Sequence, residues 1–415
     1  MKWIDTTVGE YCPFIYGKSL PQRERENGEV PVYGSNGIVD YHNTSYVKNC
    51  GIIIGRKGSV GAVHLSKAEF WPIDTAFYIE KDSIEELYFT YFLLKSLGLE
   101  HMNSDSAVPG LNRDNAHALT IRIPESEDDR KSLGSWLSQF DKKLEINNQT
   151  NQTLEQIAQA LFKSWFVDFD PVKAKIETLE AGGTVEDAEL AAMAVIAAKT
   201  PVQLAELKQT KPTDYEKLAE TAALFPAAMQ ESELGEIPVG WSSVQVGDLV
   251  LRLKSNKRYT TNQVAPYGTT PVYEQGASIL LGFHSEEAGF NATPENPIFI
   301  FGDHTCITHL SCSKFDISAN VIPLKGSLRP TIWTYYAIKG KQKFQEYRRH
   351  WSEFIIKDVV LPPLGLTESY TELVSTKYLL IESLKRQSKQ IEQLRDTLLP
   401  KLLSYEIGLR REVVE

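Results

Sequence analysis

The sequence lacks long hydrophobic runs, and its apolar stretch over residues 191–198 falls far short of the roughly 20 residues that cross a bilayer. Its first residues also lack the apolar core of a secretory signal. Cysteine is scarce, with four in 415 residues. We therefore expect a cytoplasmic chain that does not enter a membrane and whose cysteines are reduced thiols.

The chain also has no excess of basic residues, and its formal net charge is -10. The acidic excess gathers in one segment: residues 172–235 hold 6 Lys and Arg against 11 Asp and Glu. Residues 241–358 hold 13 basic against 10 acidic residues. Because phosphate neutralisation supplies much of nucleic-acid binding, this distribution permits such a partner without predicting it.

Recognisable catalytic motifs are missing too. The segment Gly17-Lys18-Ser19 has Cys12 where a phosphate-binding loop needs glycine, and no G-x-S-x-G or H-E-x-x-H pattern occurs. His304, Cys306, His309 and Cys312 lie close together, but their spacing is not that of a zinc finger and their alternation indicates a strand. We expect no catalytic residue, metal or cofactor in this chain.

What the sequence does contain is an internal repeat. Trp3 and the Val8-Gly9 pair reappear at Trp241 and Val246-Gly247, an offset of 238 residues. Residues 31–33 reappear at 271–273, an offset of 240, and residues 154–157 resemble 391–394, an offset of 237. Three matches in one order at nearly one offset predict two copies of one unit.

Each copy begins with short β-rich segments and ends with a helical one. The apolar runs at 51–55 and 297–302 end in glycine, which is typical of a buried strand followed by a turn. Residues 87–99 are expected to form a helix, with a counterpart at 332–344. Two series of residues alternate in spacing by four and three, which is the heptad pattern of a helix that packs along one face, here called a seam. The first seam comprises residues 133, 137, 140, 144, 147, 151, 154, 158, 161 and 165. The second comprises residues 366, 370, 373, 377, 380, 384, 387, 391, 394, 398 and 401.

These seams predict two long helices. Polar residues interrupt both, Asn147 and Asn151 in the first and Lys377 and Gln387 in the second, and such residues are expected to fix the helix register. Two amphipathic helices lying on separate cores remain an alternative. The fold class is therefore α+β, with two similar domains, two long coiled-coil helices and an internal repeat. The expected boundaries are domain 1 at 1–125, helix 1 at 126–170, a partly helical linker at 171–240, domain 2 at 241–363, helix 2 at 364–408 and a tail at 409–415.

The chain resembles the specificity (S) subunits of type I restriction-modification systems. The resemblance rests on residues 154–171, on residues 234–241 and on the duplication itself. It implies two target-recognition domains, related by an internal pseudo-two-fold repeat, that each read one half of a bipartite, asymmetric site in double-stranded DNA. It also implies that the two long coiled-coil helices are antiparallel and set the gap between the half-sites. It also implies two methyltransferase subunits and motor-nuclease subunits as partners, with S-adenosylmethionine, ATP and Mg held on those partners only. The chain itself is then a non-catalytic DNA-recognition and assembly subunit.

Candidate DNA contacts are polar residues expected in loops and turns at strand ends. In domain 1 they are Ser35, Asn36, Arg56, Lys57, Ser59, Ser104, Ser106, Asn112 and Arg113. In domain 2 they are Lys254, Lys257, Arg258, Gln275, Asp303, His304, Arg348 and Arg349. The expected partner-binding residues on the first long helix are Leu154, Ile157, Leu161, Phe162, Trp165 and Phe166.

Two other functions remain open from the sequence. One is a non-catalytic coiled-coil scaffold with duplicated ligand-binding domains and no nucleic acid. The other is a fused enzyme whose active site carries no familiar motif. A steep fall of DNA affinity with salt separates the first from DNA recognition, and methyl transfer by the purified chain alone separates the second.

Overall fold

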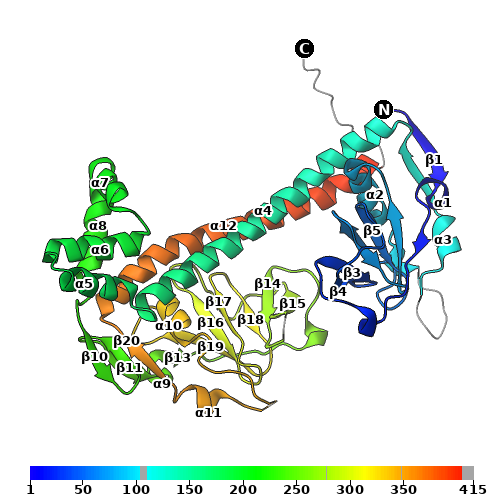
Figure 1. Ribbon diagram of the computed structural model, residues 1–415. Coiled ribbons are helices and arrows are strands. Elements are labelled where there is room, and N and C mark those ends of the chain that lie inside the picture. Colours follow the sequence, from blue (N-terminus) through cyan, green and yellow to red (C-terminus); the bar gives the residue numbers. More distant parts are fainter. Residues whose placement is uncertain (103–109, 277, 347, 404–415) are drawn as a thin grey trace. The chain divides into compact units, whose positions relative to one another are not determined.

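A computed structural model describes residues 1–102, 110–276, 278–346 and 348–403 (Figure 1). The chain divides into two compact units. Unit 1 comprises residues 1–147 and 386–415, and unit 2 comprises residues 148–385. The helices α4 (Glu127–Phe166) and α12 (Leu364–Leu403) each contribute to both units.

Unit 1 builds three small sheets, with strand orders β2-β8-β5-β6, β4-β3-β7 and β1-β9. Its strands are β1 (Trp3–Thr7), β2 (Ile15–Tyr16), β3 (Val30–Gly34), β4 (Gly37–His42), β5 (Gly51–Gly55), β6 (Val63–Ser66), β7 (Trp71–Pro72), β8 (Ala76–Glu80) and β9 (Thr120–Pro124). Its short helices are α1 (Val8–Tyr11), α2 (Ile84–Ser96) and α3 (Arg113–His117).

Unit 2 repeats the same plan, with strand orders β13-β19-β16-β17, β15-β14-β18 and β12-β20. Its strands are β12 (Ser242–Gln245), β13 (Val250–Arg252), β14 (Thr270–Tyr273), β15 (Leu280–His284), β16 (Ile298–Gly302), β17 (Thr308–Ser311), β18 (Asp316–Ile317), β19 (Val321–Gly326) and β20 (Asp358–Leu361). The helices α9 (Val246–Leu249), α10 (Thr331–Ile338) and α11 (Trp351–Phe354) correspond in order to α1, α2 and α3.

The repeat extends to the register of individual strands. In both units the Pro-Val-Tyr strand pairs with a parallel partner, β7 or β18, and its antiparallel register shifts directly after the valine. The central strands β5 and β16 both end at a glycine, Gly55 and Gly302. A Cβ atom on Gly55 would lie 2.0 Å from the Ser59 carbonyl oxygen, so the turn after this strand leaves no room for a side chain. The duplication predicted from the sequence is confirmed at the level of topology.

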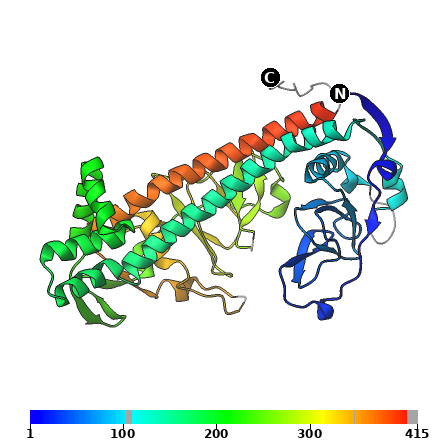
Figure 2. The same cartoon turned by 45° about the horizontal axis from the view of Figure 1, so that its top comes forward.

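Within each unit, α4 and α12 pair in antiparallel directions (Figures 1 and 2). In unit 2 the Tyr370 hydroxyl donates to the Ala158 carbonyl at 2.9 Å. In unit 1 the Asn147 amide donates to the Gln387 amide oxygen at 3.0 Å and to the Ser388 hydroxyl at 3.1 Å. Asn147 is 1% exposed, so its amide depends on these partners in place of water. Asn147 and Gln387 are two of the four polar seam residues expected to fix the register, and they contact each other; the sequence did not predict which of the four would pair.

The prediction of the second seam, on α12, is correct only in part. Leu366 and Tyr370 are buried, but Leu380 is 45% exposed, and the buried face continues through Val374 and Tyr378. The Tyr378 hydroxyl lies 2.8 Å from the hydroxyl of Tyr336 on α10. This stretch of α12 therefore turns its buried face toward the recognition domain of unit 2, whose packing replaces a pure coiled-coil seam.

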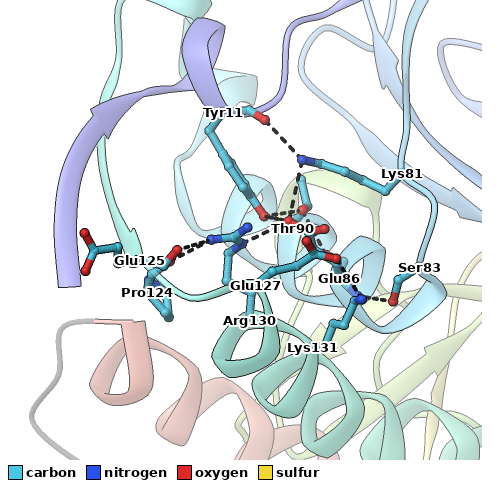
Figure 3. Close-up of polar contacts among 10 residues, drawn as sticks. All are labelled: Tyr11, Lys81, Ser83, Glu86, Thr90, Pro124, Glu125, Glu127, Arg130 and Lys131. Carbon is cyan, nitrogen blue, oxygen red and sulfur yellow. Dashed lines mark hydrogen bonds and ion pairs between the residues drawn. The ribbon is translucent and has the colours of Figure 1, made fainter. Parts of the chain in front are cut away.

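A buried polar network joins the beginning of α4 to the recognition domain of unit 1 (Figure 3). The Arg130 guanidinium donates to Glu86 at 2.9 Å and to the carbonyl oxygen of Pro124, the last residue of β9, also at 2.9 Å. Glu86 also lies 3.7 Å from Lys81 and accepts from the Tyr11 hydroxyl at 3.4 Å. Because removing one partner of a buried ion pair is strongly destabilising, this network fixes how the helix leaves the domain.

The segment expected to be a partly helical linker is a packed helical module. It comprises α5 (Asp170–Glu180), α6 (Val185–Ala197), α7 (Pro201–Thr210) and α8 (Pro212–Ala223), which gather beside one end of the long helices within unit 2 (Figure 1). The hairpin of β10 (Met229–Ser232) and β11 (Gly235–Pro238) follows. Met193 and Phe225 are buried in the main core of unit 2, so this segment contributes to that core.

Among the described residues, no single helix has the length and apolarity needed to cross a membrane. The bent pair α6 and α7, which meet at 86°, passes that test only when the two helices are taken together.

Three of the expected partner-binding residues require correction. Phe162, Trp165 and Phe166 are at most 8% exposed and belong to the core of unit 2. Their rings pack against Tyr370 of α12 at centroid distances of 5.7, 6.0 and 5.5 Å. The aromatic run that suggested a docking surface is the packing surface between the long helices and the recognition domain. Of the remaining three, Leu154 and Leu161 are half-buried and Ile157 is 41% exposed.

We predict that Trp165→Ala lowers the free energy of unfolding by about 3–5 kcal/mol, because it leaves a large cavity in this core. Ile157→Ala on the same helix is the matched control, with an expected loss near 0.5 kcal/mol, since its side chain is 41% exposed. Urea unfolding followed by far-ultraviolet circular dichroism measures both. Equal losses in the two variants would contradict the burial assigned to Trp165.

Candidate nucleic-acid interface

Unit 1 carries a cluster of arginines on an exposed tyrosine. The guanidinium carbons of Arg56 and Arg113 each lie 4.9 Å from the centroid of the Tyr16 ring. Tyr16 ends β2, Arg56 directly follows β5, and Arg113 is the first residue of α3. Stacking on an aromatic face holds a guanidinium plane in a fixed orientation while its outer N–H groups stay available.

The electrostatics of this cluster favour an anion or an electronegative base edge. Arg56 donates one N–H to the Asp74 carbonyl oxygen at 3.1 Å, which fixes its position without neutralising its charge. Arg113 pairs only loosely with Asp114, at 3.7 Å, and the Asp114 side chain is 85% exposed. Lys57 is exposed next to Arg56. The sequence therefore located three of the cationic groups of this surface, and it missed Tyr16, for which no motif gave a signal.

The other expected contacts of domain 1 have different surroundings. Ser35 is only 7% exposed, and its hydroxyl donates to the Thr75 carbonyl oxygen at 2.7 Å, so this side chain serves the fold. The Asn112 side chain caps α3 by accepting from two backbone N–H groups. Asn36 is exposed at the turn between β3 and β4, and Ser59 is half-buried in the turn after β5. Ser104 and Ser106 lie outside the described residues.

Unit 2 has a basic pocket at the corresponding place. Arg252 ends β13, Asp303 directly follows β16, and Trp351 is the first residue of α11. Together with Arg258 and Arg349, these residues line a pocket of about 430 Å³. Asp303 and Trp351 take the places of Arg56 and Arg113 in unit 1. The strand register matches Tyr16 to Lys254, two residues beyond Arg252, so Arg252 is close to the place of Tyr16 but not equivalent to it.

The structure thus brings together Arg258, Asp303 and Arg349, which are far apart in the sequence and were all candidate contacts. Sequence reasoning missed Arg252 and Trp351. The repeat was the signal that could have found them. Once Asp303 is aligned with Arg56, residues near the end of β13 and at the start of α11 become candidate contacts as well.

The remaining candidates of domain 2 do not join this pocket. Lys257 pairs with Glu286 at 2.5 Å, and Arg348 pairs with Glu353 at 2.8 Å. The Gln275 side chain accepts from the backbone N–H of His304 at 2.9 Å, on the loop after β16. Lys254 is exposed two residues beyond β13, and the His304 side chain is half-buried.

A histidine occupies the same strand position in both units. His64 pairs with Ile53 across β5 and β6, and His309 pairs with Ile300 at the matching position of β16 and β17. His309 lines a cavity of about 190 Å³ with Glu155, Tyr335, Tyr336 and Lys339. Burial, together with the positive charges of Lys385 and Lys339, lowers the pKa of His309 to about 4.

These surroundings do not suggest a metal centre, because no group of three or more His, Cys, Asp or Glu side chains among the described residues is arranged to hold a metal ion. Burial raises the pKa of the nearby Cys312 thiol to about 12, which keeps it protonated and unreactive at neutral pH.

The low pKa of His309 predicts an acid-sensitive unit 2. An unfolded histidine titrates near its ordinary pKa of 6.5, whereas the folded imidazole stays neutral down to about 4. The unfolded state therefore binds the extra proton between these values, so stability falls as the pH drops from 6.5 to 4, by up to about 3 kcal/mol.

We expect His309→Gln to flatten this pH dependence of the unfolding free energy, measured by urea unfolding at several pH values. His101→Gln is the control, because the His101 side chain is 84% exposed. An unchanged slope in His309→Gln would mean that another group controls the acid sensitivity.

Comparison with known proteins gives partial sequence matches and a likeness in fold. Residues 1–156 match the family model of the type I restriction modification DNA specificity domain. The chain is 46% identical over 167 residues to the type I restriction enzyme HindI specificity subunit of Haemophilus influenzae, a match covering 38% of this chain and 36% of that protein. It is 30% identical over 187 residues to the MjaIX specificity subunit of Methanocaldococcus jannaschii, covering 40% of this chain and 41% of that protein. The matched segments thus span well under half of either curated relative.

In fold, the chain is similar to the crystal structure of a type I restriction-modification S subunit from M. genitalium. The TM-score is 0.51 at 15% identity, over 97% of this chain and 96% of that one. At this identity the likeness concerns the fold alone, and it confirms the expected fold class.

Proposed function

We propose that this chain, which belongs to the family of type I restriction-modification specificity subunits, binds double-stranded DNA and selects its sequence. Each recognition domain reads one half of a bipartite, asymmetric site. The chain carries no chemistry of its own in this proposal. Methyltransferase subunits with S-adenosylmethionine and motor-nuclease subunits with ATP and Mg supply the reactions.

The observation that carries this proposal is that the arginine cluster of unit 1 and the basic pocket of unit 2 lie at the same part of the repeated fold. Both lie where an edge strand ends, a central strand ends and a short helix begins. Unit 1 presents Arg56 and Arg113 on Tyr16, and unit 2 presents Arg252 near Trp351 with Asp303. A shared place with different side chains lets both domains meet DNA in the same way and still make different contacts, as two readers of unlike half-sites require.

The overall acidity of the chain is compatible with this role. Steering of DNA depends on local charge, and the acidic segment 172–235 belongs largely to the helical module, not to the basic surfaces. The stacked arginines of unit 1 suit the acceptors of a guanine edge, which pair well with a fixed guanidinium fork.

The long helices have the dimensions of a spacer between half-sites. Helices of 40 residues at 1.5 Å per residue are about 60 Å long, which is between one and two turns of B-DNA. In this proposal the length of the helix pair sets the number of unread base pairs. Ile157, which remains exposed on α4, is the best placed of the expected partner-binding residues to contact another subunit.

Exchange of one recognition domain tests the two-reader proposal. We expect that replacing residues 1–125 with the corresponding domain of a relative changes one half of the methylated DNA sequence and leaves the other half and the gap unchanged. Sequencing of modified bases in cells that express the complete system measures this. A change in both halves would contradict separate readers.

Lengthening both helices tests the spacer proposal. Inserting one heptad into α4 near Asn148 and one into α12 near Arg386 keeps the helical register and adds about 10 Å. We expect the gap between half-sites to grow by about 3 base pairs, with both halves unchanged. A heptad in α4 alone is the control, and it is expected to disrupt assembly because Asn147 and Gln387 fall out of register. An unchanged gap after the double insertion would contradict the proposal.

A further inference from the structure

The basic pocket of unit 2 has more positive than negative side chains among its described lining residues. Three guanidinium groups, from Arg252, Arg258 and Arg349, line the same pocket of about 430 Å³. Asp303 is the only acidic residue among the described residues that line the pocket. Because like charges held together repel one another, such a pocket gains most from a bound anion.

The single carboxylate is already engaged by the backbone. One oxygen of Asp303 accepts from the N–H groups of His350 at 3.1 Å and Trp351 at 2.9 Å. Its other oxygen lies 3.9 Å from the Arg349 guanidinium, and the Arg349 side chain is 80% exposed. Asp303 therefore fixes the beginning of α11, and its neutralisation of the arginines is weak.

Contacts with the surrounding chain hold two of the arginines at the pocket. Arg258 donates through one nitrogen to the carbonyl oxygens of Ser318 at 2.8 Å and Val321 at 2.9 Å, which anchors its side chain at the pocket wall. Arg252 lies over the ring of Trp351, at 5.7 Å from the centroid. Burial and the charge of Arg252 lower the pKa of Arg258, consistent with neighbouring cations that lack a counter-ion.

We propose that this pocket binds a phosphate group. A phosphate offers several oxygens that accept simultaneously from guanidinium groups in different directions, which suits three arginines that line one concave surface. This inference rests on the proposed DNA-binding function for its biological source: the phosphate is one of the DNA backbone, so the pocket anchors domain 2 without selecting sequence.

The test combines two measurements on the full chain and three variants. Arg349→Gln and Arg252→Gln each remove one charge from the pocket, and the exposure of Arg349 makes its substitution harmless to folding. Lys208→Gln is the matched control, because Lys208 lies on α7 of the helical module, away from the pocket lining.

The first measurement is thermal unfolding in inorganic phosphate at constant ionic strength. Phosphate is expected to raise the midpoint of the wild-type chain and of Lys208→Gln, and to have a smaller effect on the two pocket variants. Equal shifts in all four proteins would overturn the phosphate site, whatever the chain does with DNA.

The second measurement is the salt dependence of DNA binding by the full chain assembled with its partner subunits. Each pocket variant is expected to reduce the slope of log affinity against log salt by about 1, equally for duplexes that differ in the second half-site. A change of sequence preference without a change of slope would overturn the anchoring role and indicate base reading. If the wild-type assembly shows no salt-dependent DNA binding, the proposed function fails, and a phosphate effect in the first measurement then assigns the pocket to a free phosphorylated ligand.

Discussion

The antiparallel pairing of α4 and α12 is the constraint on which each unit depends. In unit 1 the pairing is fixed by Asn147, whose buried amide has Gln387 and Ser388 as partners. In unit 2 it is fixed by Phe162, Trp165 and Phe166 around Tyr370. A slip of either helix leaves a polar group unpaired in one unit and opens an aromatic core in the other, so both units oppose it.

The recognition domains show how a duplicated fold supports two different surfaces. The strand orders, the register shift after Val32 and Val272, and the glycine that ends the central strand are common to both copies. The side chains at the strand ends are not, since Arg56 in one copy corresponds to Asp303 in the other. The two copies therefore share one arrangement of strands and carry different side chains where the strands end.

The sequence predicted the features that depend on local pattern and on the repeat. The offset of matching motifs predicted the duplicated topology. The polar interruptions indicated that the helix register is fixed, without indicating that Asn147 meets Gln387. The sequence failed where tertiary packing decides. The run from Phe162 to Phe166 resembled a docking surface because one helix viewed alone gives no sign that Tyr370 covers it. Arg252 and Trp351 were missed because residues so far apart in the chain meet only through the sheet order.

The methylated motif of the wild-type system tests the central claim most directly. Sequencing of modified bases in DNA from cells that express this chain with its partner subunits reads the site without any variant. Two readers at equivalent positions with different side chains predict a bipartite site of two unlike halves separated by a fixed, unread gap. A continuous motif, or two identical halves, would contradict the account.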